Sequence, residues 1–292
     1  MEAVEPYEGV CMYLEIFDVE HGACALITTS NGKHVMIDCG HNSTTGWKPS
    51  TELITRGIWS LDQLIVSNYD EDHVSGFPDL VGLINIKVLA RNASVSTTVL
   101  RTLKSEDGMD RGIAYLCHYI DNVFNGGLPG LADNNYGDTS FIFFRNTPGI
   151  PPFGFDDENN LSLVTFVTCG AHRFIFPGDM EKAGWRALLE SPLFRVYLNG
   201  VTNFIASHHG RENGYLEDVM TLCPHIQAVI VSDEKMGFQS QEMVDQYRNH
   251  ARGFWINSGE RRVLTTRRDG YMRFDVSALT GMCLVTLSTV SA

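Results

Sequence analysis

The residues with the clearest chemical meaning stand in one stretch, from Leu64 to Gly76. An apolar, strand-like run ends there at Asp70, Asp72 and His73, so two carboxylates and an imidazole follow a buried strand. Carboxylate oxygens and imidazole nitrogens are ligands that Zn, Mn and Fe take in proteins. The three residues therefore predict part of a metal site, which residues from elsewhere in the chain must complete.

Two later strand-like runs end in ligands of the same kind. Asp179 follows residues 174–178, and His208 and His209 follow residues 204–207. Neighbouring strand ends converge at one edge of a sheet, so the three clusters are expected to meet there. The plain alternatives are a solvated acidic loop that caps a helix and, for Asp179, a simple Gly-Asp turn. The agreement of three clusters favours a site for one or two ions of Zn or Mn.

The elements that would position these clusters begin with three antiparallel strands, expected at residues 11–19, 23–29 and 34–38. The pair Asn31-Gly32 tolerates positive φ and predicts a hairpin between the last two strands. A helix is expected at 50–58, before the strand that ends at Asp70. Helix-like and strand-like segments then alternate through 77–86, 88–90 and 96–103, which indicates a layered α/β arrangement.

The second half of the chain begins with a region that shows little periodicity, residues 105–152. Its Asn/Gly-rich tract at 122–138 is expected to form a surface loop or a lid over a cleft. Beyond it we expect strands at 160–169, 172–176, 202–206, 226–232, 262–266, 271–276 and 282–286, and helices at 181–189 and 241–250. No internal repeat or linker is evident, so we expect a single domain over residues 1–292.

Composition indicates an ordinary globular protein, since 43% of its 292 residues are hydrophobic. The acidic N-terminus lacks the features of a secretory signal, and no apolar run approaches the ~20 residues of a membrane helix. We therefore expect a cytoplasmic protein that does not contact membranes. The net charge of −13, from 22 basic and 35 acidic residues, disfavours general adhesion to duplex nucleic acid or an anionic membrane.

The seven cysteines form no Cys-x-x-Cys pair, and most of them lie within apolar, strand-like segments. An odd, scattered set of this kind is typical of reduced thiols in a core rather than of a disulfide framework or a thiolate metal site.

The order of the three clusters resembles the metallo-beta-lactamase superfamily. Asp-x-Asp-His at residues 70–73, Gly-Asp at 178–179 and His-His-Gly at 208–210 follow one another as the family's motifs do, although Asn68 stands where the first motif usually has His. The chain is most similar to the soluble hydrolase domain of competence-type DNA-uptake proteins, in which Asp also occupies the position of Asp70. Further collinear matches lie at residues 17–22, 36–40, 159–163, 176–179 and 266–270.

The resemblance implies an α/β fold, the four-layer αββα sandwich, with the site between two sheets at one edge. It assigns Asp70 to a first metal and Asp72 with His73 to a second, with Asp179 as a bridge between them. These three residues, Asp70, Asp72 and His73, are the expected catalytic residues, because the metals they hold would activate a water. The expected metal ligands are Asn68, Asp70, Asp72, His73, Asp179, His208 and His209. An amide is a weaker ligand than an imidazole, so Asn68 leaves the number of ions open.

The resemblance also implies a metal-dependent hydrolase, and we favour a phosphodiesterase or nuclease that acts on single-stranded nucleic acid or a nucleotide second messenger. Asn160, His209 and Arg211 are the expected substrate contacts. The arginines between residues 248 and 273 form either a phosphate-contacting rim or a solvated hairpin face. The alternatives are a degenerate, non-catalytic member that binds a nucleotide or a protein, and a lactone or thioester hydrolase. A protein partner or a homo-oligomer is also compatible with the sequence.

Overall fold

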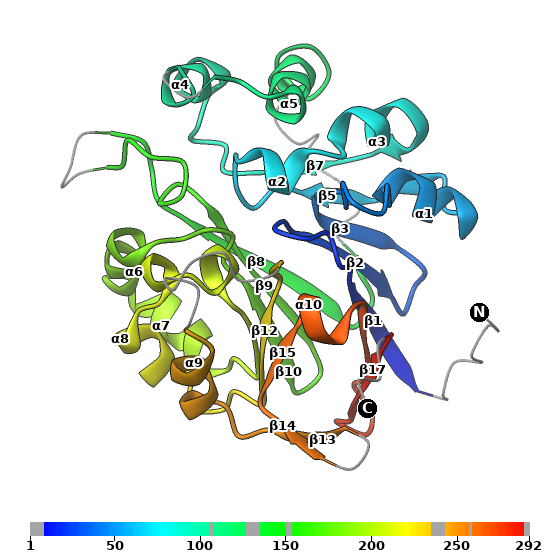
Figure 1. The fold of residues 1–292 in the computed structure, drawn as a ribbon, viewed down its shortest axis with the longest axis vertical. Coiled ribbons are helices and arrows are strands. Elements are labelled where there is room, and N and C mark those ends of the chain that lie inside the picture. The colour runs from blue at the N-terminus through cyan, green and yellow to red at the C-terminus, as the bar shows by residue number, and fades with distance from the viewer. Residues whose placement is uncertain are drawn as a thin grey trace.

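Two β-sheets lie face to face, and helices cover their outer faces (Figure 1). The computed structural model describes residues 9–105, 108–126, 135–149, 154–234, 243–256 and 259–288. Three buried apolar clusters separate the layers: one between the sheets, one under the helices of the first sheet and one under those of the second. The predicted four-layer αββα sandwich is therefore confirmed.

The first sheet has seven strands in the order β17-β16-β1-β2-β3-β5-β7. They are β1 (Val10–Ile16), β2 (Cys24–Thr29), β3 (His34–Cys39), β5 (Gln63–Ile65), β7 (Leu89–Ala90), β16 (Met272–Ser277) and β17 (Cys283–Leu287). The pairs from β17 to β3 are antiparallel, whereas β3, β5 and β7 are parallel. The parallel strands β3 and β5 end beside each other, which brings Asp38 near the loop that starts at Val66.

The second sheet has six strands in the order β15-β12-β11-β10-β9-β8. They are β8 (Thr139–Arg145), β9 (Leu163–Cys169), β10 (His172–Phe176), β11 (Asn203–Ile205), β12 (Ala228–Val231) and β15 (Val263–Thr265). Strands β8, β9 and β10 are antiparallel, and β10, β11, β12 and β15 are parallel. The carboxyl ends of β10 and β11 therefore lie at one edge, and Asp179 and His209 follow them there.

The helices pack on the two outer faces through their apolar sides (Figure 1). Beside the first sheet lie α1 (Pro49–Thr55), α2 (Glu71–Val74), α3 (Phe77–Leu83), α4 (Thr97–Leu103) and α5 (Arg111–Asn122). Beside the second lie α6 (Lys182–Leu189), α7 (Pro192–Asn199), α8 (Glu217–Thr221) and α9 (Val244–His250). Between the sheets, the rings of Phe174 and Phe274 meet edge to face with centroids 5.5 Å apart. The apolar layers thus hold the sheet edge that carries the candidate residues.

Short elements complete the described chain. They are the strand pairs β4 (Ser60–Leu61) with β6 (Asn85–Ile86) and β13 (Phe254–Ile256) with β14 (Gly259–Arg261), the helix α10 (Thr266–Asp269), and the 3-10 turns Ser207–Gly210 and Glu212–Gly214. No helix among the described residues is long and apolar enough to cross a lipid bilayer.

Both predicted hairpins form, the first across Gly32 at φ 76° and the second across Gly170 at φ 56°. Residues 105–152, which showed little periodicity, contain α5 and β8, and half of the proposed loop or lid at 122–138 lies outside the described residues. The expected helix at 77–86 ends at Leu83, and its last residues form β6 instead.

The prediction of reduced core thiols is wrong for one pair, because Cys11 and Cys169 form a disulfide. The two residues are 158 positions apart, on β1 and β9, and only the stacking of the two sheets brings them together. The remaining cysteines, Cys24, Cys39, Cys117, Cys223 and Cys283, are free.

Candidate metal centre

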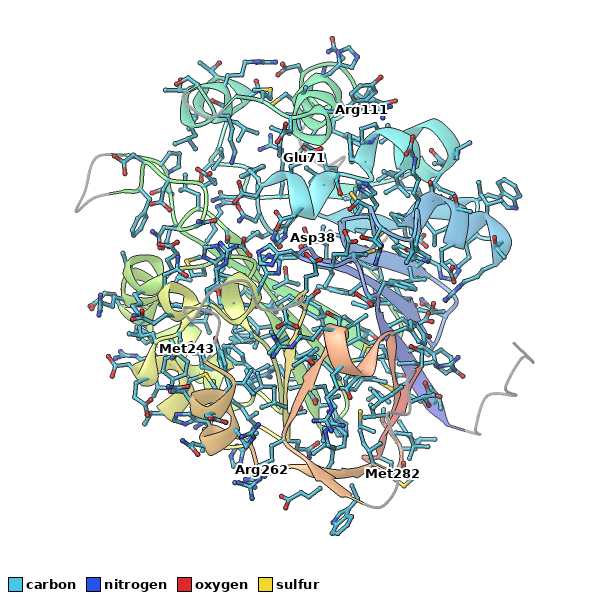
Figure 2. All side chains as sticks on the ribbon, viewed as in Figure 1. Asp38, Glu71, Arg111, Met243, Arg262 and Met282 are labelled. Carbon is cyan, nitrogen blue, oxygen red and sulfur yellow. A yellow bond between two sulfur atoms is a disulfide. The ribbon has the colours of Figure 1, made fainter. Side chains whose placement is uncertain are left out.

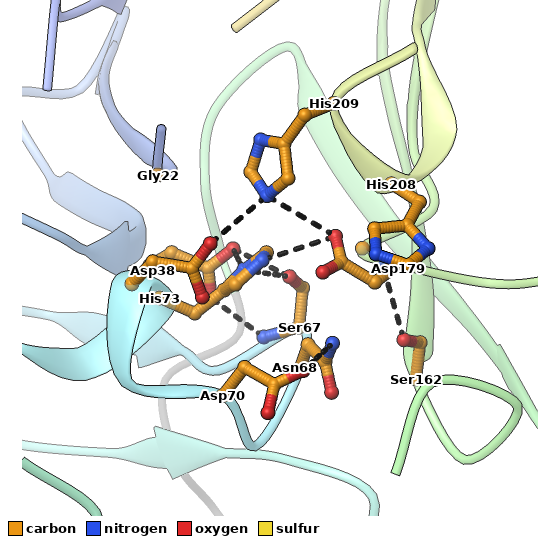
Figure 3. A network of polar contacts seen from close by, with 12 residues as sticks. Gly22, Asp38, Ser67, Asn68, Asp70, His73, Ser162, Asp179, His208 and His209 are labelled. Atoms are coloured by element: carbon orange, nitrogen blue, oxygen red, sulfur yellow. Dashed lines mark hydrogen bonds and ion pairs between the residues drawn. The ribbon is translucent and has the colours of Figure 1, made fainter. Parts of the chain in front are cut away.

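Four of the predicted side chains converge at one point. Asp72, His73, Asp179 and His209 each offer a ligand atom, and these atoms lie within 4.8 Å of one another. Asp72 and His73 come from α2 beside the first sheet, whereas Asp179 and His209 follow β10 and β11 of the second. Figure 3 shows His73 facing Asp179 and His209. The candidate centre therefore lies between the two sheets.

The position of Asp72 and His73 depends on the short helix α2, which begins after Asp70. The Glu71 carboxylate accepts hydrogen bonds from the backbone amides of Gly112 and Ile113, at the start of α5, over 2.8 and 3.1 Å. These bonds satisfy two donors that the first turn of a helix leaves free. Helix α2 is thereby held against α5, with its next two side chains turned toward the second sheet.

The His208-His209-Gly210 turn is strained in a way that the sequence does not reveal. All three residues have left-handed backbone angles, with φ of 50°, 53° and 78°. For the two histidines this conformation costs about 1–2 kcal/mol per residue. The amide of His208 donates to the carbonyl oxygen of Gly178 over 3.2 Å, which ties the turn to the loop of Asp179. Strain of this kind is concentrated at functional sites, because the surrounding structure must hold it.

Asp38 orients His73, a role that was not predicted from the sequence. Its buried carboxylate lies 2.9 Å from Nδ1 of His73 and accepts hydrogen bonds from the amide, at 2.7 Å, and the hydroxyl of Ser67. Nε2 of His73 then faces Asp179, 3.1 Å from Oδ1. Such a carboxylate fixes the ring and makes the free nitrogen a better ligand. The sequence feature that could have identified Asp38 is a carboxylate at the end of a buried strand, followed by Cys39-Gly40.

The ring of His209 is also held in one orientation, in this case by a backbone carbonyl group. Its Nδ1 lies 2.9 Å from the carbonyl oxygen of Ser232. Its Nε2 is buried and makes no hydrogen bond, although it lies 3.2 Å from Asp72 Oδ2 and 3.6 Å from Asp179 Oδ1. A buried imidazole nitrogen without a hydrogen bond, facing two carboxylates, fits a metal ion. Two imidazoles and two carboxylates are a donor set that suits Zn or Mn.

Without a bound ion, protons on the two imidazoles balance the negative charges of the carboxylates. Burial acts to lower the pKa of His73, but Asp179 and Asp38 raise it well above the usual 6.5. Burial likewise opposes a charge on His209, yet Asp179 and Asp72 raise its pKa. Burial acts to raise the pKa of Asp179, whereas His73 and His209 lower it. A divalent ion that bound here would therefore displace protons from the imidazoles.

The structure places Asp70 and Asn68 beside the four-residue cluster but outside it. Asp70 pairs with the ammonium group of Lys104, which also pairs with Glu158. Asn68 is fully buried, and its amide nitrogen lies 3.3 Å from Asp70 Oδ2 and 3.0 Å from Asn159 Oδ1. Figure 3 shows Asn68 and Asp70 together below Ser67, away from His209.

His208 belongs to a second arrangement, centred on Arg211. The guanidinium group donates to Nε2 of His208 over 2.8 Å and to Nε2 of His21 over 2.7 Å. Burial, with the charges of His209 and Arg211, lowers the pKa of His21 to about 4, and burial also lowers the pKa of His208. Both rings are then neutral and accept from the guanidinium. The ring centroid of His21 lies 4.3 Å from that of His209, so the two arrangements adjoin.

A cleft of about 420 Å³ opens onto the cluster. Its wall carries acidic groups, two histidines and two cations, and is lined by His21, Asp70, Glu71, Asp72, Lys104, Gly108, Asp110, Ile113, Glu158, Asp179, His208 and Arg211. Of the four cluster residues, Asp72 has the most exposed side chain, at 28%.

Other expected substrate contacts lie elsewhere. Asn160 is buried, and its side chain accepts from the amide of Gly184 over 2.6 Å and donates to Asp157 over 3.0 Å, so it fixes the start of α6. None of the described arginines beyond Arg211 lines the cleft. Figure 2 shows Arg262 near the lower edge of the molecule, away from Asp38 near the middle.

Comparison with known proteins agrees with this geometry in part. A family model described as the metallo-beta-lactamase superfamily matches residues 17–118, which include Asp72 and His73 but not Asp179 or His209. No curated protein matches the sequence.

Similar solved structures share little sequence with the chain. A diphosphatase from the PhnP family is 10% identical, with a TM-score of 0.42, over 89% of this chain and 96% of that one. Zn(2+)-bound PqqB from Methylobacterium extorquens is 9% identical, with a TM-score of 0.32, over 66% and 71%. CmlA, a diiron beta-hydroxylase from Streptomyces venezuelae, is 11% identical, with a TM-score of 0.36, over 76% and 45%.

Proposed function

We propose that this protein is a metal-dependent hydrolase whose substrate is a phosphodiester, in single-stranded nucleic acid or in a nucleotide second messenger. One observation carries the choice of an anionic substrate. The guanidinium group of Arg211 lines the cleft beside the cluster, and its hydrogen-bond partners among the described residues are neutral imidazoles. Since no carboxylate neutralises it there, its charge is available to a phosphate oxygen.

Asp72, His73, Asp179 and His209 would hold the ion. A divalent ion bound there supplies Lewis acidity, which makes water a nucleophile near neutral pH and polarises a phosphoryl oxygen. Asp38 and the carbonyl group of Ser232 keep Nε2 of both histidines turned inward. The carboxylate of Asp72, the most exposed of the four, can accept a proton from a water in the cleft.

The chain carries a net charge of −13, and acidic side chains dominate the cleft wall. This field repels an anion, so productive binding depends on Arg211, Lys104 and the ion. A selective site of this kind fits a small or single-stranded phosphodiester better than a long duplex, which needs an extended basic surface.

The test is hydrolysis of bis(p-nitrophenyl) phosphate, single-stranded DNA, RNA and cyclic nucleotides by protein loaded with Mn²⁺ or Zn²⁺. Asp179→Asn and His209→Ala should lower the rate about 100-fold or more. Loss of a residue that only supports a metal ligand already lowers metal affinity or activity about 10–100-fold, and these two residues would bind the ion directly. His118→Ala is the matched control, since His118 is exposed on α5. A purified chain that cleaves none of these substrates faster than Asp179→Asn would refute the proposal.

The choice of a phosphodiester is tested separately with Arg211→Ala. We expect kcat/KM to fall about 10-fold or more for an anionic diester and to change little for p-nitrophenyl acetate. Faster turnover of lactones or thioesters than of every phosphodiester would favour the alternative hydrolase. Metal binding below about one ion per chain, with no turnover, would favour a non-catalytic binding protein. The likeness to DNA-uptake hydrolase domains, the cytoplasmic location and a protein partner or homo-oligomer also remain predictions.

A further inference from the structure

A lysine ammonium group stands between two carboxylates in the cleft, next to the four-residue cluster. Nζ of Lys104 contacts Asp70 and lies 2.7 Å from Glu158 Oε1. The side chain of Lys104 is only 10% exposed, and those of Asp70 and Glu158 are 28% and 21% exposed. All three residues line the cleft that Asp72 and Asp179 also line. A positive charge is thus built into the wall of the site.

Both oxygens of Asp70 already have a donor. Lys104 approaches Oδ1, and the amide nitrogen of Asn68 lies 3.3 Å from Oδ2. Asn68 is itself fixed, because it is fully buried, its nitrogen also reaches Asn159, and its oxygen accepts from the amide of Tyr69 over 2.5 Å. A metal ion could reach Asp70 only by displacing the ammonium group, which would leave a nearly buried cation with Glu158 as its one remaining carboxylate partner in the cleft.

The backbone holds Lys104 in this place. The residue directly follows α4, and its amide donates to the carbonyl oxygen of Leu100 over 3.0 Å. Helix α4 begins at Ser96, whose side chain accepts from the amide of Val99, and Arg101 pairs with Asp121 of α5. The ammonium group is therefore presented by an anchored helix end and not by a free surface side chain.

We propose that the ammonium group of Lys104 takes the place of a second metal ion, so that the centre binds one divalent ion per chain. The ion is held by Asp72, His73, Asp179 and His209, and Lys104 neutralises Asp70 and Glu158. Among the described residues, the candidate cluster of His, Cys, Asp and Glu ligands does not include Asp70. This inference deepens the proposed function and rests on it, because it assumes that the cluster binds metal.

The experiment is a count of bound ions, which does not depend on turnover. Wild-type protein and a Lys104→Met variant are dialysed against the same saturating Zn²⁺ or Mn²⁺, and the metal per chain is measured by plasma mass spectrometry. Wild type should bind one ion. Lys104→Met should bind two, because Asp70 and Glu158 lose their cation and gain room for another. With Mn²⁺, electron paramagnetic resonance should show a spin-coupled pair in the variant only.

Two further variants serve as controls. Lys104→Arg keeps the charge and should bind one ion. Lys182→Met removes a lysine that pairs with the exposed Glu212 and should also bind one ion. If Lys104→Met does not fold, as judged by circular dichroism, Lys104→Gln, which also removes the charge, replaces it and should bind two ions.

The outcomes separate the inference from the proposed function. Two ions in wild type, or a folded Lys104→Met variant that binds only one, would overturn the role of Lys104 and leave the proposed hydrolase intact. No bound ion in any variant, at saturating metal, would overturn the proposed function and this inference with it. One ion in wild type and two in Lys104→Met supports the inference whether or not the right substrate has been found.

Discussion

The two histidines of the cluster are held by different partners, which governs how protons compete with a metal ion. His73 is oriented by the carboxylate of Asp38, whereas His209 is oriented by the carbonyl oxygen of Ser232. Both imidazoles also face Asp179. The pKa values of both rings are therefore raised despite their burial, and each ring must lose a proton before it can bind metal.

We predict that metal affinity rises with pH above the usual imidazole pKa of 6.5. Without metal, a raised imidazole pKa stabilises the fold at pH values below the unfolded pKa, and this stability is lost as pH rises through the folded pKa. The melting temperature of chelator-treated protein should thus fall as pH rises above the usual imidazole pKa of 6.5, while that of metal-loaded protein should not. Calorimetry at several pH values measures both, and parallel curves for the two forms would contradict this role of the histidines.

For individual residues, the sequence predicted the candidate site where side chains that bind metals follow the ends of strands. Asp72, His73, Asp179 and His209 could be found because each follows a recognisable strand. Lys104 could not, since a lysine after a helix is ordinary, and nothing local shows that its ammonium group reaches Asp70. Only tertiary contacts distinguish such a residue.

Glycine residues determine how closely the elements around α2 pack. A Cβ atom added to Gly40, just after β3, would lie 2.4 Å from the carbonyl oxygen of Asp72, and one added to Gly22 would lie 2.7 Å from it. The same carbonyl group accepts from the amide of Ala23 over 3.3 Å. The backbone of Asp72 thus packs against two glycines, at positions where a side chain would have no room.

We predict that Gly40→Ala shifts α2 and lowers both stability and metal affinity. Overpacking of this kind costs about 1–3 kcal/mol, and the displaced Asp72 should weaken metal binding about 10-fold or more. Gly82→Ala on α3 is the matched control, because an added Cβ meets nothing within 4 Å there. Chemical denaturation and metal titration measure the two effects. Unchanged metal affinity in Gly40→Ala would show that the contact does not position Asp72.

Among the elements, hairpins were easier to predict than helices. The Asn31-Gly32 and Gly170 turns carry strong local signals, and both hairpins were correct. Helix α7 was missed, although Ser191 caps it and Pro192 begins it. Strand β8 was missed because its inner face is buried only by tertiary contacts, and its partner β9 begins beyond a stretch with little periodicity.

At the scale of the whole molecule, the Cys11–Cys169 disulfide joins the two sheets across the core. Disulfides persist in oxidising compartments, whereas the composition of the chain favoured a cytoplasmic protein. The redox state of this pair is therefore informative about where the protein works. The αββα layering itself could be predicted from the order of the motifs, but this link between layers could not.

We predict that denatured, unreduced protein has five thiols that react with an alkylating reagent and that reduction exposes two more. Because the bond closes a loop of 158 residues, reduction should lower the free energy of unfolding by about 2–4 kcal/mol. A Cys11→Ala/Cys169→Ala variant should not respond to reductant, whereas Cys117→Ala should respond as wild type does. Mass spectrometry after alkylation counts the thiols, and seven reactive thiols before reduction would contradict the pairing.

The pairing of β1 with β16 has a consequence for the order in which the chain can fold. Val10 to Ile16 lie beside Met272 to Ser277, so β1 gains this neighbour only after residues 272–277 have been made. During synthesis, β1 keeps one unpaired edge until the ribosome has passed these residues, and unpaired edges favour aggregation. Contacts so distant in sequence also slow folding. By contrast, every residue of the candidate metal centre has emerged by His209, long before the sheet beside it is closed.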